Sequence, residues 1–98
     1  MSHVCACPNP PGGQIVCSDD QLAICGFRDG QFVGGCFAVP AYNSMSWTLQ
    51  TITGAHAAAH TYDQAIAILK LGFYENPATG EIVRFSLPKD FWQGNSAR

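Results

Sequence analysis

Cysteines are the residues of this sequence with the most evident capacity for chemistry, and all five lie within the first 36 positions. Such a cluster indicates sulfur atoms that converge on one place, either as disulfides or as metal ligands. Four thiolates suit tetrahedral zinc, and His3 is a further candidate ligand. We predict a zinc site formed by four of the five cysteines, Cys5, Cys7, Cys17, Cys25 and Cys36. An iron–sulfur cluster is disfavoured because closely grouped Cys-x-x-Cys runs are absent.

The choice between metal and disulfides depends on the compartment in which the protein works. The opening residues, Met1 to Cys5, have neither the basic segment nor the apolar core of a signal peptide, which favours the cytoplasm. Clustered thiols in a reducing cytosol are more often metal ligands than disulfides. A processed exported domain could begin in the same way. In that alternative, two disulfides would tie the N-terminal loops together, with the fifth cysteine free or bridging to another chain.

A second group of candidate ligands lies further along the chain. His56, His60 and Asp63 stand at positions i, i+4 and i+7, so one continuous helix would carry them on a single face, where two imidazoles could hold a divalent ion. No Glu lies between the histidines to act as the base of a metalloprotease, which favours a plain solvent-facing stripe. A metal-dependent enzyme built on this face is our third hypothesis. A cysteine nucleophile activated by a histidine ranks lower still.

Composition limits the other classes of function. The length of 98 residues predicts a single domain, 1–98. Because 47% of the residues are hydrophobic and only 12% are charged, we expect a partner or a second copy to cover part of its surface. Its five basic residues are dispersed and the net charge is −2, so nucleic-acid binding lacks an electrostatic basis. No apolar run is long enough for a membrane span.

We divide the domain into two sub-regions. The sequence pattern of the first, residues 1–36, predicts a cysteine-rich antiparallel β unit. Residues 3–7 alternate as a strand, 14–17 form a second strand, and the dipeptide Asp29-Gly30 predicts a tight hairpin between 22–28 and 31–36. In that register Cys25 faces Gly34 and Ala23 faces Cys36. Cys25 and Cys36 then become diagonal neighbours on one face, about 7 Å apart, close enough to share an ion but poorly placed for a direct disulfide.

In the second sub-region, residues 47–92, the sequence predicts a strand, one helix and a hairpin. Residues 47–53 alternate and are rich in β-branched side chains, which favours a strand. A helical stripe covers 55–71, although Thr61 and Gln64 match a capping box that would begin the helix at Tyr62 instead. Gly72 should end the helix, and the hairpin uses residues 73–75 and 81–87. An exposed Trp92 in the tail would be an anchor for a partner.

The sequence therefore predicts an α+β fold: a small cysteine-rich antiparallel β unit followed by a strand, one helix and a β-hairpin. Our leading functional hypothesis is a small zinc-stabilised module for protein binding or assembly, without catalysis of its own. The alternative is an exported, disulfide-stabilised binding domain or inhibitor. Loss of metal on chelation would support the first hypothesis, and collapse under reductant alone would support the second.

Overall fold

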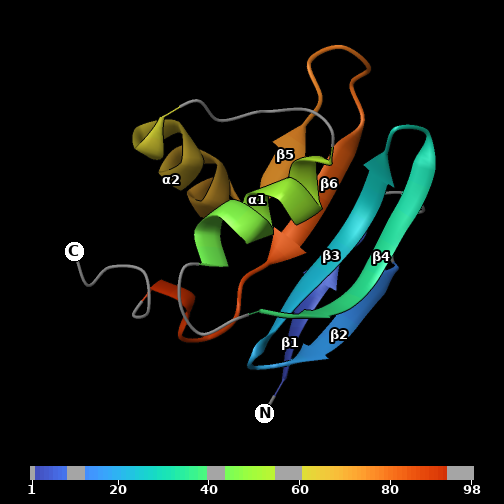
Figure 1. Ribbon diagram of the computed structural model, residues 1–98. Coiled ribbons are helices and arrows are strands. Elements are labelled where there is room, and N and C mark those ends of the chain that lie inside the picture. Colours follow the sequence, from blue (N-terminus) through green and yellow to red (C-terminus); the bar gives the residue numbers. More distant parts are fainter. Residues whose placement is uncertain (1, 9–12, 40–43, 55–60, 93–98) are drawn as a thin grey trace.

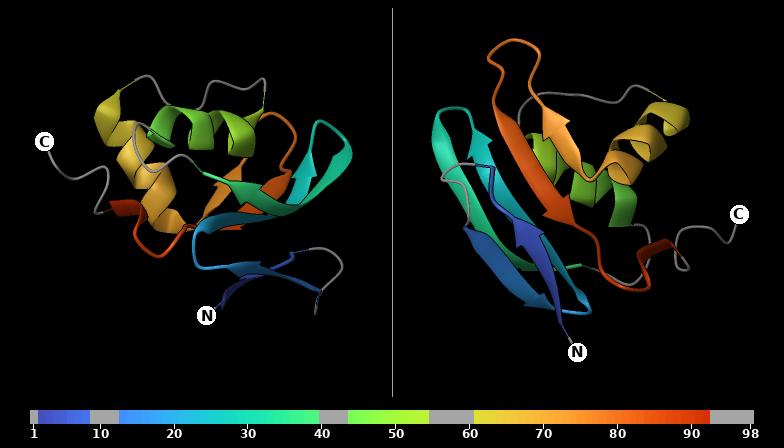
Figure 2. Two further views of the ribbon diagram at one scale, coloured as in Figure 1. Left: turned by 60° about the horizontal axis from the view of Figure 1, so that its bottom comes forward. Right: turned by 180° about the vertical axis from the view of Figure 1, so that it is seen from behind.

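The computed structural model describes residues 2–8, 13–39, 44–54 and 61–92, and it confirms the α+β class (Figure 1). A four-stranded antiparallel sheet lies between two other layers. Both helices cover one of its faces, and a two-stranded hairpin lies against the other (Figure 2). The elements are β1 (Ser2–Ala6), β2 (Gln14–Ser18), β3 (Gln21–Arg28), β4 (Gln31–Ala38), α1 (Ser44–Thr53), α2 (Tyr62–Leu71), β5 (Phe73–Glu75) and β6 (Ile82–Ser86).

Strand β3 is central to the larger sheet, whose order is β4-β3-β6-β5. The predicted turn at Asp29-Gly30 is confirmed, because both residues have the positive φ angles, 56° and 79°, that a two-residue hairpin turn requires. The register is also as predicted, with Cys25 opposite Gly34 and Ala23 opposite Cys36. The second predicted hairpin forms as the antiparallel pair β5–β6.

Alternation along β3 divides the interior into two clusters. Leu22 and Ile24 face the helices and belong to the main core, whereas Ala23 and Cys25 face the β1–β2 hairpin. The main core contains Leu22, Ile24, Ile52, Leu69, Val83, Phe85 and Phe91. The cluster under the hairpin has smaller side chains, namely Cys5, Cys17, Ala23 and Cys25.

The prediction of a strand at 47–53 is wrong, since these residues belong to helix α1. Thr48 and Ile52 are fully buried at a spacing of four residues, which suits a helix packed on the sheet. The β-branched composition favoured a strand, but two of the threonine hydroxyls are accommodated within the helix, while the buried Thr48 hydroxyl has no hydrogen-bond partner among the described residues. The hydroxyls of Thr51 and Thr53 donate to backbone carbonyls four residues earlier, over 2.9 and 2.8 Å.

Helix α2 follows the second of the two predicted starts. Thr61 is its N-cap and forms the reciprocal capping box with Gln64, and Gly72 ends the helix in a left-handed conformation with φ of 82°. The part of the longer predicted helix at 55–60 lies outside the described residues. Within the described ranges, neither helix is long and apolar enough to cross a membrane.

Candidate functional site

Two disulfides hold the β1–β2 hairpin against the four-stranded sheet. Cys7, just after β1, is bonded to Cys25 on β3, and Cys17 on β2 is bonded to Cys36 on β4. The Cα atoms of the bonded pairs are 5.1 and 5.6 Å apart, and the pairs are separated by 18 and 19 residues in sequence. Each bond therefore connects the hairpin layer to a different strand of the sheet.

This pairing follows from the register of the β3–β4 hairpin. Cys25 and Cys36 face the same side of the sheet, and the β1–β2 hairpin packs on that side. Each sulfur therefore meets a cysteine of the hairpin below it rather than its diagonal neighbour. Ala23, opposite Cys36, is completely buried at this interface, where its small side chain permits the close approach of the two layers.

The prediction of a zinc-stabilised module is accordingly wrong. Four of the five sulfur atoms are used in the disulfides, and the part of the chain that the structure describes contains no group of three His, Cys, Asp or Glu side chains able to hold a metal ion. The covalent part of the alternative hypothesis, two disulfides with a fifth cysteine unpaired, is what the structure shows. Disulfides therefore stabilise the N-terminal part of the chain, for which the sequence predicts a metal ion.

Cys5 is the remaining free thiol, and it is buried in the cluster under the hairpin with 3% of its surface exposed. Burial raises the pKa of the Cys5 thiol above its ordinary value, while the Arg84 charge and the Cys25 backbone oppose the increase more weakly. A neutral, buried thiol is a poor nucleophile. The geometry therefore gives Cys5 a packing role, in contrast to the activated cysteine considered from the sequence.

His3 is fully engaged in holding the hairpin to the sheet. Its Nε2 lies 2.8 Å from the Gln21 carbonyl oxygen, which can only accept, so Nε2 carries the proton. Its Nδ1 lies 2.6 Å from the Ser86 hydroxyl oxygen, within hydrogen-bond distance. Both ring nitrogens are thus occupied by protein groups on β3 and β6, and His3 joins the disulfides as a third connection between the two layers.

The second group of predicted ligands is only partly described. Asp63 lies in the first turn of α2, where it is exposed and where a carboxylate interacts favourably with the helix dipole. His56 and His60 lie outside the described residues. A metal-dependent enzyme built on these three side chains stays a prediction from the sequence.

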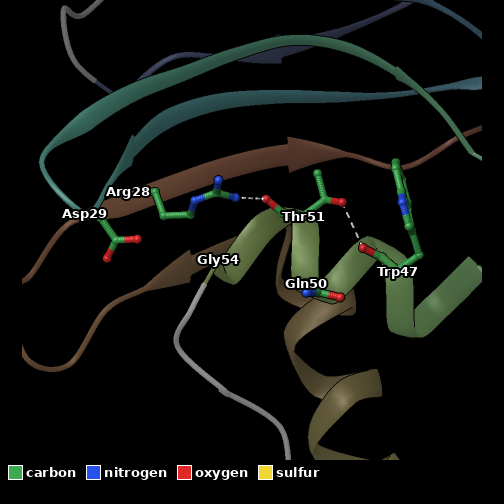
Figure 3. Close-up of a pocket in the computed structure, with 6 residues that line it drawn as sticks. All are labelled: Arg28, Asp29, Trp47, Gln50, Thr51 and Gly54. Atoms are coloured by element: carbon green, nitrogen blue, oxygen red, sulfur yellow. Dashed lines mark hydrogen bonds between the residues drawn. The ribbon is translucent and has the colours of Figure 1, made fainter.

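An open cavity of about 550 Å³ lies where the β3–β4 turn meets α1 (Figure 3). Arg28 crosses it and donates from its guanidinium to the Thr51 carbonyl, in the last turn of α1, where a cation interacts favourably with the helix dipole. Trp47 forms the far wall, with 38% of its surface exposed. Arg28 therefore stabilises the end of the helix.

Strands β1, β2 and β4 together form a surface that we call the hairpin-side surface. These three strands, all described in full, contain no Asp, Glu, Lys or Arg. Val4 and Val16 lie opposite each other with 47% and 54% of their surfaces exposed, and Phe32 is 55% exposed while it packs edge-on against Phe27. The alternation of these residues was visible in the sequence, but which strands lie together was not.

No family model, curated protein or solved structure matches this chain closely enough to place it in a family. The functional assignment therefore rests on the geometry of the disulfides and of the hairpin-side surface.

Proposed function

We propose that this chain is a disulfide-stabilised binding domain that works in an oxidising compartment and presents its hairpin-side surface to a protein partner. The observation that carries the proposal is that both disulfides join the β1–β2 hairpin to the sheet behind it. An isolated two-stranded hairpin is at best marginally stable in water. The small side chains beneath this hairpin bury little apolar area, so covalent bonds supply what its core lacks.

The same two bonds support an oxidising compartment. Disulfides form and persist in secreted, periplasmic or lumenal proteins, whereas cytosolic reductants keep thiols reduced. Because closing the two loops removes conformational freedom from the unfolded chain, each bond contributes about 3 kcal/mol to stability under oxidising conditions. This argument supports the exported alternative.

The binding role is supported by the character of the stabilised surface. Exposed apolar side chains that are not interrupted by charges mark interaction sites on soluble proteins. Val4, Val16 and Phe32 are such side chains, and they lie on the strands that the disulfides hold in place. A rigid surface also loses less conformational entropy on binding, which favours affinity.

Alkylation followed by intact mass measurement tests the proposal. The folded, freshly purified protein should be lighter by four hydrogens than the reduced chain, two for each disulfide. After unfolding without reductant, only Cys5 should be alkylated, whereas all five cysteines should react after reduction. The Cys5→Ala variant is the matched control and should take up no alkyl group before reduction.

Five alkyl groups on unreduced protein that retains native circular dichroism would overturn the proposal.

Binding is tested separately by replacing both exposed valines, Val4→Ser and Val16→Ser, on the outer face of the hairpin. The double variant should keep its disulfides and thermal stability but lose association with partners, including any second copy, that contact this face.

A further inference from the structure

Strand β4 is an open edge of the four-stranded sheet. Only β3 pairs with it, and within the described residues no strand lies beyond it (Figure 1). Because Arg28 and Gln31 flank a two-residue turn, they exchange backbone hydrogen bonds, and every second residue of β4 after Gln31 does the same with β3. The backbone N–H and C=O groups that point away from the sheet are those of Phe32, Gly34, Cys36 and Ala38.

In the part of the chain that the structure describes, this edge lacks the devices by which proteins usually prevent edge-to-edge pairing. Its eight residues include no charge and no proline, and the four residues with outward backbone groups are all exposed. The opposite edge differs, since β5 has only three residues and ends in the exposed carboxylate of Glu75. The long, uncharged edge is therefore the one open to another strand.

We propose that β4 pairs antiparallel with β4 of a second copy of this chain, which joins the two sheets into one of eight strands. The inference rests on the proposed function, because it names the partner of the binding domain. An antiparallel pair of identical strands has two-fold symmetry, so each outward N–H and C=O group meets its complement on the other copy. Neither strand carries a charge, so no like charges are brought together.

The Cys17–Cys36 disulfide holds the edge strand β4 in a fixed position before it pairs. The Cys36 sulfur lies 3.3 Å from the Val16 carbonyl oxygen, which places β2 directly beneath β4. The edge strand is thus held from below by a covalent bond while its outer side stays open. A preformed strand loses less conformational entropy on pairing than a mobile one.

Hydrogen exchange at single amides, combined with sedimentation equilibrium, tests the pairing. At high concentration the mass should be twice 10.5 kDa, and the amides of Phe32, Gly34, Cys36 and Ala38 should exchange slowly. On dilution to monomer these four should exchange rapidly, while the amides that bond to β3, such as those of Val33 and Phe37, stay protected. This alternation distinguishes edge pairing from contact through either face.

Two substitutions on β4 should weaken the dimer. Phe32→Lys places a charged side chain near each end of the paired edge, a device that discourages edge-to-edge pairing, and should raise the dimer dissociation constant by roughly tenfold. Gly34→Pro removes an outward N–H that the monomer does not use, with the same expected direction. Ala67→Lys adds the same charge on the exposed surface of α2 and should leave the constant unchanged.

A protein that stays monomeric at millimolar concentration would overturn the inference, as would a dimer in which the four outward amides exchange rapidly. If the alkylation experiment shows two disulfides but no dimer forms, only this inference fails. If the disulfides themselves are absent, the proposed function fails regardless of the oligomeric state.

Discussion

Gly26 of β3 lies directly opposite Val83 of β6, and the two strands approach so closely that a methyl group on Gly26 would stand 2.5 Å from the Val83 Cα. The same methyl group would also collide with the Ile82 carbonyl oxygen. Both obstacles are backbone atoms, so neither can move aside by a change of rotamer. This position joins the β3–β4 hairpin to the β5–β6 hairpin, and only glycine fits there.

Gly26→Ala should therefore destabilise the protein by about 3 kcal/mol, the cost of overpacking a rigid interior. Urea unfolding of the oxidised protein measures the change. The matched control is Gly34→Ala, where the nearest atoms belong to the flexible Phe32 side chain, and its cost should be below about 1 kcal/mol. Equal costs at the two positions would show that β3 and β6 can separate to admit a methyl group.

The two disulfides should contribute almost equally to stability. Their sequence separations, 18 and 19 residues, are nearly the same, so the entropy removed from the unfolded chain is also similar. Replacing either bonded pair by alanines should lower the free energy of unfolding by about 3 kcal/mol. The two double variants are Cys7→Ala with Cys25→Ala, and Cys17→Ala with Cys36→Ala.

Cys5→Ala is the control for those double variants, since it removes a buried sulfur without removing a bond. We expect it to cost about 1 kcal/mol. If one of the double variants costs no more than this control, the corresponding disulfide does not restrain the unfolded chain as we infer.

Stability should decrease in alkaline solution because of Cys5. The pKa of its folded thiol is raised above 9.0, chiefly by burial. At pH values well below 9.0 the thiol is protonated in both states, and its contribution is fully present. As the pH rises past 9.0 the unfolded thiol ionises first, so the free energy of unfolding falls until the folded thiol ionises as well.

Carbon-13 titration of the Cys5 Cβ measures the folded pKa directly, and its midpoint should lie above 9.0. Arg84→Met should move the midpoint higher still, because the Arg84 charge favours the thiolate. Lys70→Met, which removes a charge from helix α2, should leave it in place. A midpoint below 9.0 would mean that the thiol is open to water.

Glu81 should be important for the β3–β4 turn although it lies far from it in sequence. Its carboxylate accepts from the Asp29 and Gly30 amides over 2.9 and 2.7 Å, one at each oxygen. Glu81→Gln removes the charge and turns one acceptor into a donor, so we expect a loss of about 2 kcal/mol in urea unfolding. Glu75→Gln, at an exposed site on β5, is the control and should leave the free energy of unfolding nearly unchanged. A similar loss of stability there would show that the net charge of the protein, and not the two hydrogen bonds, causes the effect.

Features encoded by neighbouring residues were predictable from the sequence. The Asp29-Gly30 hairpin and its register, the Thr61 capping box and the Gly72 cap are each specified within a few positions, and all three are confirmed. Helix α1 was not predictable in this way. Its threonines and Ile52 favour a strand locally, and only packing against the sheet favours the helix.

The cysteine pairing could not be predicted for a related reason. The register correctly placed Cys25 and Cys36 on one face, but their partners come from a hairpin that stacks on that face without pairing with it. Strand pairing leaves a local signature in turns and alternation, whereas the stacking of one layer on another depends on contacts between distant segments. The metal hypothesis failed at this step, since it assumed that sulfurs on one face share one ion.

The disulfides also determine how this chain would carry a mechanical load. A pull at Ser2 can peel away only the five residues of β1 before the tension reaches Cys7. From there the force passes through the covalent bond into Cys25 on β3, a strand with a neighbour on each side. Strand β2 lies outside this covalent path. A reductant would open the path, and the same pull would then draw out the whole hairpin.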